Sequence, residues 1–190
     1  MEPGLYTLSD LITDPKTGIQ MNARDRIDET IKAASLADQV GLDVFGVGEH
    51  HRLDFAVSSP AVVLAAIAQT TNRIRLTSAV TVLSAADPVR VFQDFSTVDL
   101  ISGGRAEIIA GRGVFTEPFP LFGVDLRDYD QLFSEKLDLL RKLNRTERIT
   151  WIGNFRSALQ NVEISPRPIQ RELPIWIGVG GYAAECGPRG

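Results

Sequence analysis

The sequence has a single cysteine, Cys186, and therefore cannot form an internal disulfide bond. So few thiols are typical of proteins in a reducing compartment, and we expect a cytoplasmic protein. Long hydrophobic runs are also absent: the longest strongly apolar stretch, Pro60–Ala68, is too short to span a bilayer. No basic segment followed by an apolar one opens the chain, so we expect no secretory leader.

An excess of positive charge is missing as well. The chain has 20 Lys and Arg against 24 Asp and Glu, a net charge of -4, whereas nucleic acids and anionic membranes bind basic surfaces. We therefore expect neither nucleic acid nor a membrane as a partner. The length of 190 residues suits one domain, residues 1–190, with a sizeable core.

Short apolar runs alternate with segments of helical period along most of the chain. Strands are expected at residues 4–8, 44–47, 74–83, 106–110 and 175–179. Helices are expected at residues 23–40, after Ser59-Pro60, after Asp87-Pro88, and from residue 128 or 130 to 143. A hairpin insertion is expected at residues 149–164, and an irregular tail at residues 182–190. This alternation predicts an α/β fold with a parallel sheet and right-handed crossovers.

Polar residues follow several of these strands. Glu49, His50 and His51 come after the second, Arg112 lies between two glycines after the fourth, and Gly180-Gly181 follow the fifth. The carboxyl ends of parallel strands meet at one rim, so these groups should converge there. A histidine titrates near neutral pH, an arginine offers a forked donor to phosphate, and a diglycine suits a backbone nest for an anion.

Each of these features also has a simpler structural interpretation. Adjacent histidines are commonly ordinary surface residues, and an arginine between glycines is commonly a solvated turn. Residues 178–181 lack the full dinucleotide-binding fingerprint, and the sequence has no Gly-x-Ser-x-Gly elbow for a serine nucleophile. Only two histidines are present, and neighbours on a strand point to opposite faces, so we expect no metal site.

Several motifs carry a more specific signal: Glu49-His50-His51, the strand at 76–83, Asp87-Pro88-Val89-Arg90, and the segments 102–107 and 110–113. Together, and in order from about residue 2 to residue 181, they resemble the bacterial luciferase-like family of flavin-dependent monooxygenases. The resemblance implies a TIM-type (β/α)8 barrel. It also implies reduced FMN, or in some branches a deazaflavin, acting with dioxygen on a small organic substrate. The Glu49-His50-His51 form favours FMN.

The resemblance also assigns roles to individual residues. His50 matches the histidine beside the reactive edge of the flavin and is the expected catalytic residue, with His51 a less certain neighbour. The Ser78-Ala79 bond matches a non-prolyl cis peptide under the flavin ring. Arg112 matches an arginine that reaches the flavin phosphate. The remaining expected cofactor-binding residues are Glu49, Gly180 and Gly181.

The chain departs from the family pattern in its extent. A complete barrel needs eight strands, whereas this sequence supplies five and a tail without the usual helix start. We therefore expect an incomplete barrel, from a truncated or frameshifted family member or from a piece cut from a longer protein. Its open edges should favour a homo-oligomer, such as a dimer, and its flavin affinity and turnover should be weak. The alternatives are a non-catalytic half-barrel that binds flavin or a partner, and a metal-dependent hydrolase, for which ligands are lacking.

Overall fold

The computed structural model describes residues 1–179, and its centre is one sheet of parallel strands. The strands are β1 (Gly4–Thr7), β2 (Val44–Val47), β3 (Arg75–Ser78), β4 (Thr81–Val82), β5 (Ala106–Gly111) and β8 (Ile175–Ile177). The order is β1-β2-β3-β5, where β3 and then β4 pair with the same edge of β5 and β8 pairs with its other edge. Because β3 and β4 form one broken strand, the sheet is an incomplete barrel of five parallel strand paths.

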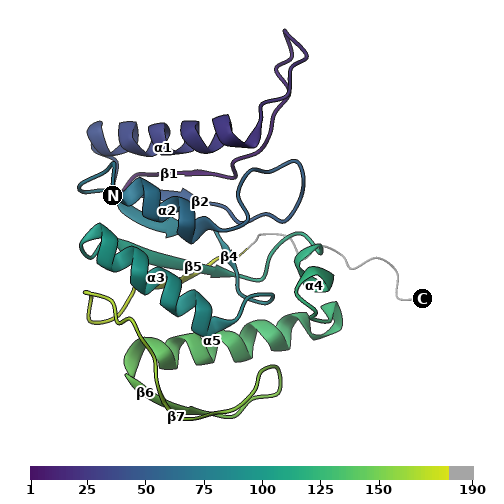
Figure 1. Cartoon of the computed structure of the whole chain (residues 1–190), viewed down its shortest axis with the longest axis vertical. Helices are drawn as coiled ribbons and strands as arrows, with labels where there is room; N and C mark the ends of the chain where they lie inside the picture. The colour runs from purple at the N-terminus through teal and green to yellow at the C-terminus, as the bar shows by residue number, and fades with distance from the viewer. Residues whose placement is uncertain (180–190) are drawn as a thin grey trace.

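Four long helices cover the convex face of this sheet. They are α1 (Ala23–Gln39), α2 (Pro60–Ala68), α3 (Pro88–Ser102) and α5 (Tyr129–Arg145). Figure 1 shows them side by side in chain order, as expected from right-handed crossovers. The antiparallel hairpin of β6 (Arg148–Trp151) and β7 (Leu159–Glu163) follows α5, as the sequence predicted.

Local capping chemistry explains where the helices begin and end. The Asn22 side chain accepts a hydrogen bond from the Asp25 amide at the start of α1, and Asp87 accepts from the Val89 amide at the start of α3. Gly103 ends α3 with φ of 71°, a conformation that glycine adopts without steric cost. Ser59 precedes α2 but makes no side-chain capping bond, so the following proline defines that start.

The hydrophobic core lies between the sheet and the helices. Fully buried side chains come from both layers: Phe45, Leu76 and Ile108 from the strands, and Leu64, Phe92 and Leu140 from the helices. The concave face of the sheet is different, because Tyr6 of β1 and Trp176 of β8 remain 65% and 56% exposed. The packed interior is therefore the helix side of the sheet.

The sequence predicted a single strand over residues 74–83. This prediction is wrong, because two residues interrupt the strand. Ser78 still pairs with Val47, and the Ala79 amide donates to the Val47 carbonyl at 2.7 Å, so strand geometry continues to that point. The non-prolyl cis peptide lies at Ala79–Val80, one bond later than the Ser78-Ala79 bond expected from the resemblance. The break therefore follows the last bond to β2.

Two short elements were not anticipated from the sequence. Helix α4 (Pro118–Leu121) and the single 3-10 turn Leu126–Asp128 lie between β5 and α5, in a segment whose mixed Pro, Gly and aromatic content has no clear period.

Within the described residues, no helix combines the length and the apolar character needed to cross a membrane.

Candidate functional site

The loops that follow β2, β3 and β5 meet at one edge of the sheet. The Val82 amide donates to Glu49 Oε2 at 3.0 Å, which joins the segment after β3 to the residues that follow β2. The Leu83 amide donates to the Gly111 carbonyl at 2.9 Å, and the rings of His50 and Phe115 lie 5.5 Å apart. Figure 1 shows α4 at the same end of the molecule. His50, Ser78 and Arg112 thus lie at the carboxyl ends of neighbouring strands, at the same end of the sheet, as the parallel topology predicted.

His50 lies in an aromatic environment. Its ring stacks on Phe55 at 4.0 Å between centroids, and Phe115 approaches it edge-on. Both ring nitrogens are buried, and neither has a hydrogen-bond partner among the described residues. Burial lowers the pKa of His50 below its usual value of 6.5, and the charges of Glu49 and Asp54 oppose this shift only in part. His50 is therefore a neutral imidazole with uncommitted nitrogens near pH 7.

His51, by contrast, is committed to a protein partner. Its Nε2 lies 2.9 Å from Glu49 Oε1, and the exposed fractions of the two side chains are 7% and 10%. An ionised carboxylate can only accept, so Nε2 is the protonated nitrogen of this ring. The second Glu49 oxygen accepts the Val82 amide, and Phe122 packs edge-on against His51. Both oxygens of Glu49 are thus engaged within the protein.

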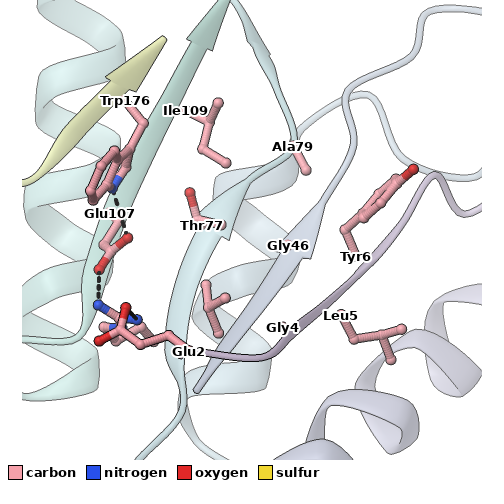
Figure 2. Close-up of a pocket in the computed structure, with 12 residues that line it drawn as sticks. Glu2, Gly4, Leu5, Tyr6, Gly46, Thr77, Ala79, Glu107, Ile109 and Trp176 are labelled. Carbon is pink, nitrogen blue, oxygen red and sulfur yellow. Dashed lines mark hydrogen bonds and ion pairs between the residues drawn. The ribbon is translucent and has the colours of Figure 1, made fainter. Parts of the chain in front are cut away.

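Ser78 is the last residue of β3 and Ala79 follows it, but their surroundings differ. The buried Ser78 hydroxyl donates to the Ile109 carbonyl at 3.2 Å and accepts from the Ile109 amide and the Thr81 hydroxyl. These bonds use the hydrogen-bonding capacity of the side chain, so Ser78 connects β3 to β5. Ala79 instead lies at the concave face beside Gly46 (Figure 2).

Arg112 extends from the end of β5 toward helix α5. Its Nε lies 3.1 Å from Asp130 Oδ1, and its guanidinium lies over the Phe133 ring at 4.6 Å. With 38% of the side chain exposed, this cation remains accessible from solvent. The flanking glycines do not open a path to the backbone, because the Val80 and Val82 side chains occupy the space beside them.

The concave face of the sheet holds a hollow of about 350 Å³. Two small residues, Gly46 and Ala79, are part of its lining, and Tyr6 and Trp176 stand on either side (Figure 2). Glu107 lies level with Gly46 in the strand register; it is buried, accepts from Trp176 Nε1 at 3.0 Å and lies 3.2 Å from an Arg75 nitrogen. Glu107 was not singled out from the sequence, although a carboxylate between apolar residues of a strand is a signal for such an inward-facing ion pair.

The residues at this rim fit a flavin mononucleotide in chemical terms. A phosphate needs a cation with donors, which Arg112 offers, and a planar ring needs a surface of small residues, which Gly46 and Ala79 offer. His50 supplies ring nitrogens that no group of residues 1–179 bonds. Gly180 and Gly181, also expected to contact the cofactor, lie outside the described residues. Among residues 1–179 no group of three or more His, Cys, Asp or Glu could hold a metal ion.

Comparison with known proteins places this arrangement in context. The family model described as luciferase-like monooxygenase matches residues 1–185. The chain is 33% identical to the uncharacterized protein y4vJ of Sinorhizobium fredii over 84% of this chain and 46% of that protein. It is 26% identical to the alkanal monooxygenase alpha chain of the Kryptophanaron alfredi symbiont, over 83% of this chain and 44% of that one. The chain spans about half the length of the curated relatives it matches.

Solved structures give the same result for the fold. The monooxygenase RslO1 from Streptomyces bottropensis superposes with a TM-score of 0.83 at 26% identity, covering 93% of this chain and 53% of that one. The oxygenating constituent of 3,6-diketocamphane monooxygenase from Pseudomonas putida, in complex with FMN, superposes with a TM-score of 0.78 at 21% identity, over 93% and 51% of the two chains. A further relative is the F420-dependent glucose-6-phosphate dehydrogenase of Amycolatopsis mediterranei, 26% identical over 88% of this chain and 53% of that one.

Proposed function

We propose that this chain, which belongs to the luciferase-like monooxygenase family, takes part in a flavin-dependent monooxygenase reaction. Reduced FMN, when bound, would supply the two electrons with which one oxygen atom of dioxygen enters a small organic substrate and the other leaves as water. The observation that supports this proposal is the neutral His50, which has no hydrogen-bond partner among the described residues, at the rim that also carries Arg112.

The residues of this chain would divide the work as follows. His50 would hold or transfer one proton at a ring nitrogen, since its lowered pKa leaves it unprotonated near pH 7. Arg112 would bind the phosphate of FMN, exchanging its pairing with the exposed Asp130 for the ligand. Phe55 and Phe115 would exclude water around His50. Ala79 would present a small surface to the flavin ring.

Cofactor binding is the first test of this proposal. Anaerobic titration of the purified chain with FMN should give saturable binding, and riboflavin, which lacks the phosphate, should bind at least about tenfold more weakly. The Arg112→Ala variant should lose this preference for FMN, whereas Arg127→Ala, an exposed arginine paired with Asp125, should retain it. Equal binding of FMN and riboflavin by the unaltered chain would contradict the role of Arg112.

Cofactor F420 is the competing ligand, because an F420-dependent relative is among the matches. A titration with reduced F420 under the same conditions decides between the two, and we expect FMN to bind more tightly. Absence of binding to either cofactor would overturn the proposed function.

Turnover is a separate question from binding. We expect the chain to bind flavin weakly and to oxidise an aldehyde slowly with reduced FMN and dioxygen, because its barrel is incomplete. Binding that is unaffected in a His50→Ala variant, together with loss of the residual oxidation, would support catalysis by His50. Binding without any oxidation would favour the alternative, a non-catalytic flavin-binding protein. We expect the chain to form a homo-oligomer, which sedimentation of the same sample would reveal.

A further inference from the structure

We infer that Glu49 is a positioning residue, which holds the break between β3 and β4 against the end of β2. This inference rests on the proposed flavin site. It assigns Glu49 an action through two protein groups, the His51 ring and the Val82 amide, and no direct contact with the cofactor.

The hydrogen bonds of Glu49 are the basis of this inference. Its Oε1 accepts from His51 Nε2 at 2.9 Å and its Oε2 accepts from the Val82 amide at 3.0 Å. The side chain is 10% exposed, so these two bonds take the place of the hydrogen bonds that water would otherwise donate to the carboxylate. Bonds to an ionised carboxylate are stronger than those between neutral groups, which makes this a firm connection between two loops.

The location of the Val82 amide gives this connection its consequence. Ala79 and Val80 form the break in the strand, and Ala79 lies at the concave face beside Gly46. The chain is held to β2 on the near side of the break by the Ala79 amide, which donates to the Val47 carbonyl. Glu49 holds it on the far side through Val82. The two bonds together fix the height of the break relative to β2, and so the surface offered to a flavin ring.

The same carboxylate distinguishes the two adjacent histidines. His51 donates its Nε2 proton to Glu49, so this proton is not available to a ligand. The ring nitrogens of His50, in contrast, have no partner among the described residues. Because the two residues are neighbours in the chain, fixing the His51 ring also restricts the backbone from which His50 projects. Glu49 therefore positions both the surface under the flavin and the imidazole beside it.

The test compares three variants for FMN affinity and for thermal stability. Glu49→Ala should weaken FMN binding by about tenfold or more. Glu49→Gln keeps an acceptor for Val82 and a donor for the other tautomer of His51, so its affinity should stay within about threefold of the unaltered chain. Asp38→Ala is the matched control, because this buried carboxylate accepts the backbone amides of residues 72–74 at the opposite end of the strands. It should lower the melting temperature without changing FMN affinity.

Nitrogen NMR of the two histidines gives a second readout that general destabilisation does not move. In the unaltered chain the protonated nitrogen of His51 should be Nε2, and in Glu49→Gln the proton should shift to Nδ1. Normal FMN affinity in Glu49→Ala would overturn the inference. Equal weakening in Glu49→Gln and Glu49→Ala would also overturn it, because the charge itself would then be the contact. Failure of the unaltered chain to bind FMN would instead overturn the proposed function.

Discussion

The guanidinium of Arg105, at the start of β5, donates to the carbonyl of Ala68, the last residue of α2, at 3.1 Å. Further donations reach the carbonyls of Thr71, Ile74 and Ser102 and the Thr71 hydroxyl. One side chain therefore satisfies carbonyl groups that the end of a helix leaves without partners. Arg105 connects helix, loop and sheet at the end of the strands opposite to the candidate site.

Replacing Arg105 by lysine should destabilise the fold without affecting the site. A lysine amine cannot reproduce the fork of donors, and the carbonyls left unpaired should cost about 2 to 3 kcal/mol of unfolding free energy. Urea denaturation measures this loss. Arg127→Lys is the control, because Arg127 is exposed and its ion pair is with Asp125, two residues away in the chain, so its change should stay below about 0.5 kcal/mol. A loss of FMN affinity in Arg105→Lys at a temperature where it is folded would contradict a purely structural role.

Asp99 should be the most sensitive carboxylate of helix α3. It is fully buried and accepts from the backbone amides of Ala106, Ile169 and Gln170 and from the Gln170 side chain. Asp99→Ala leaves these donors unpaired and should cost about 3 kcal/mol or more in unfolding free energy. Asp94→Ala, on the same helix but pairing with Arg90 at only 3.9 Å, should cost less than about 0.5 kcal/mol. Similar losses in the two variants would show that the buried network adds little.

His50 should make the protein less stable in mild acid. Its pKa is lowered in the folded state, so below the usual value of 6.5 the unfolded chain binds a proton that the folded chain resists. Unfolding free energy should therefore fall as pH drops from 6.5 toward the lowered pKa of His50. A His50→Phe variant retains the aromatic packing and should show a smaller fall between pH 7.5 and 5.5 in urea denaturation. An equal fall in both proteins would mean that other groups carry the pH dependence.

Phe115 should control the titration of His50 through burial. Removing this ring in Phe115→Ala admits water to the imidazole and should raise the pKa of His50 toward its usual value, because desolvation is the main cause of its depression. The chain has only two histidines, so proton NMR can follow each ring across pH. Phe122→Ala is the control, since Phe122 contacts His51 and should leave the His50 titration unchanged. A His50 pKa that does not move in Phe115→Ala would contradict this account.

The sequence predicted the parallel sheet and the helix starts because these depend on local signals. Asn22 and Asp87 form the expected caps, and the strand-end residues meet at one edge because parallel topology requires it. The break at Ala79–Val80 could not be located in the same way. Residues 74–83 are β-prone throughout, and the break is fixed by bonds to Val47 and Glu49 from a distant segment.

The roles of individual motif residues were equally hidden in the linear sequence. The family resemblance favoured His50 over His51, but the residue types alone do not distinguish them. In the structure His51 contacts Glu49, whereas the ring nitrogens of His50 have no partner among the described residues. The segment 102–107 contributed to the family resemblance, yet its Arg105 supports the far end of the barrel. A motif can therefore identify a family through residues that maintain the fold, as well as through those at the site.

The hydroxyl of Ser78 carries a consequence for motion. The Ser78 hydroxyl bonds both the amide and the carbonyl of Ile109, and it also bonds Thr81. Both pieces of the interrupted strand are therefore connected to β5. Neither piece can slide along β5 without breaking several hydrogen bonds at once. We therefore expect the loops that carry Phe55 and Phe115 to adapt to ligands of different shape, while β3 and β4 remain fixed against β5.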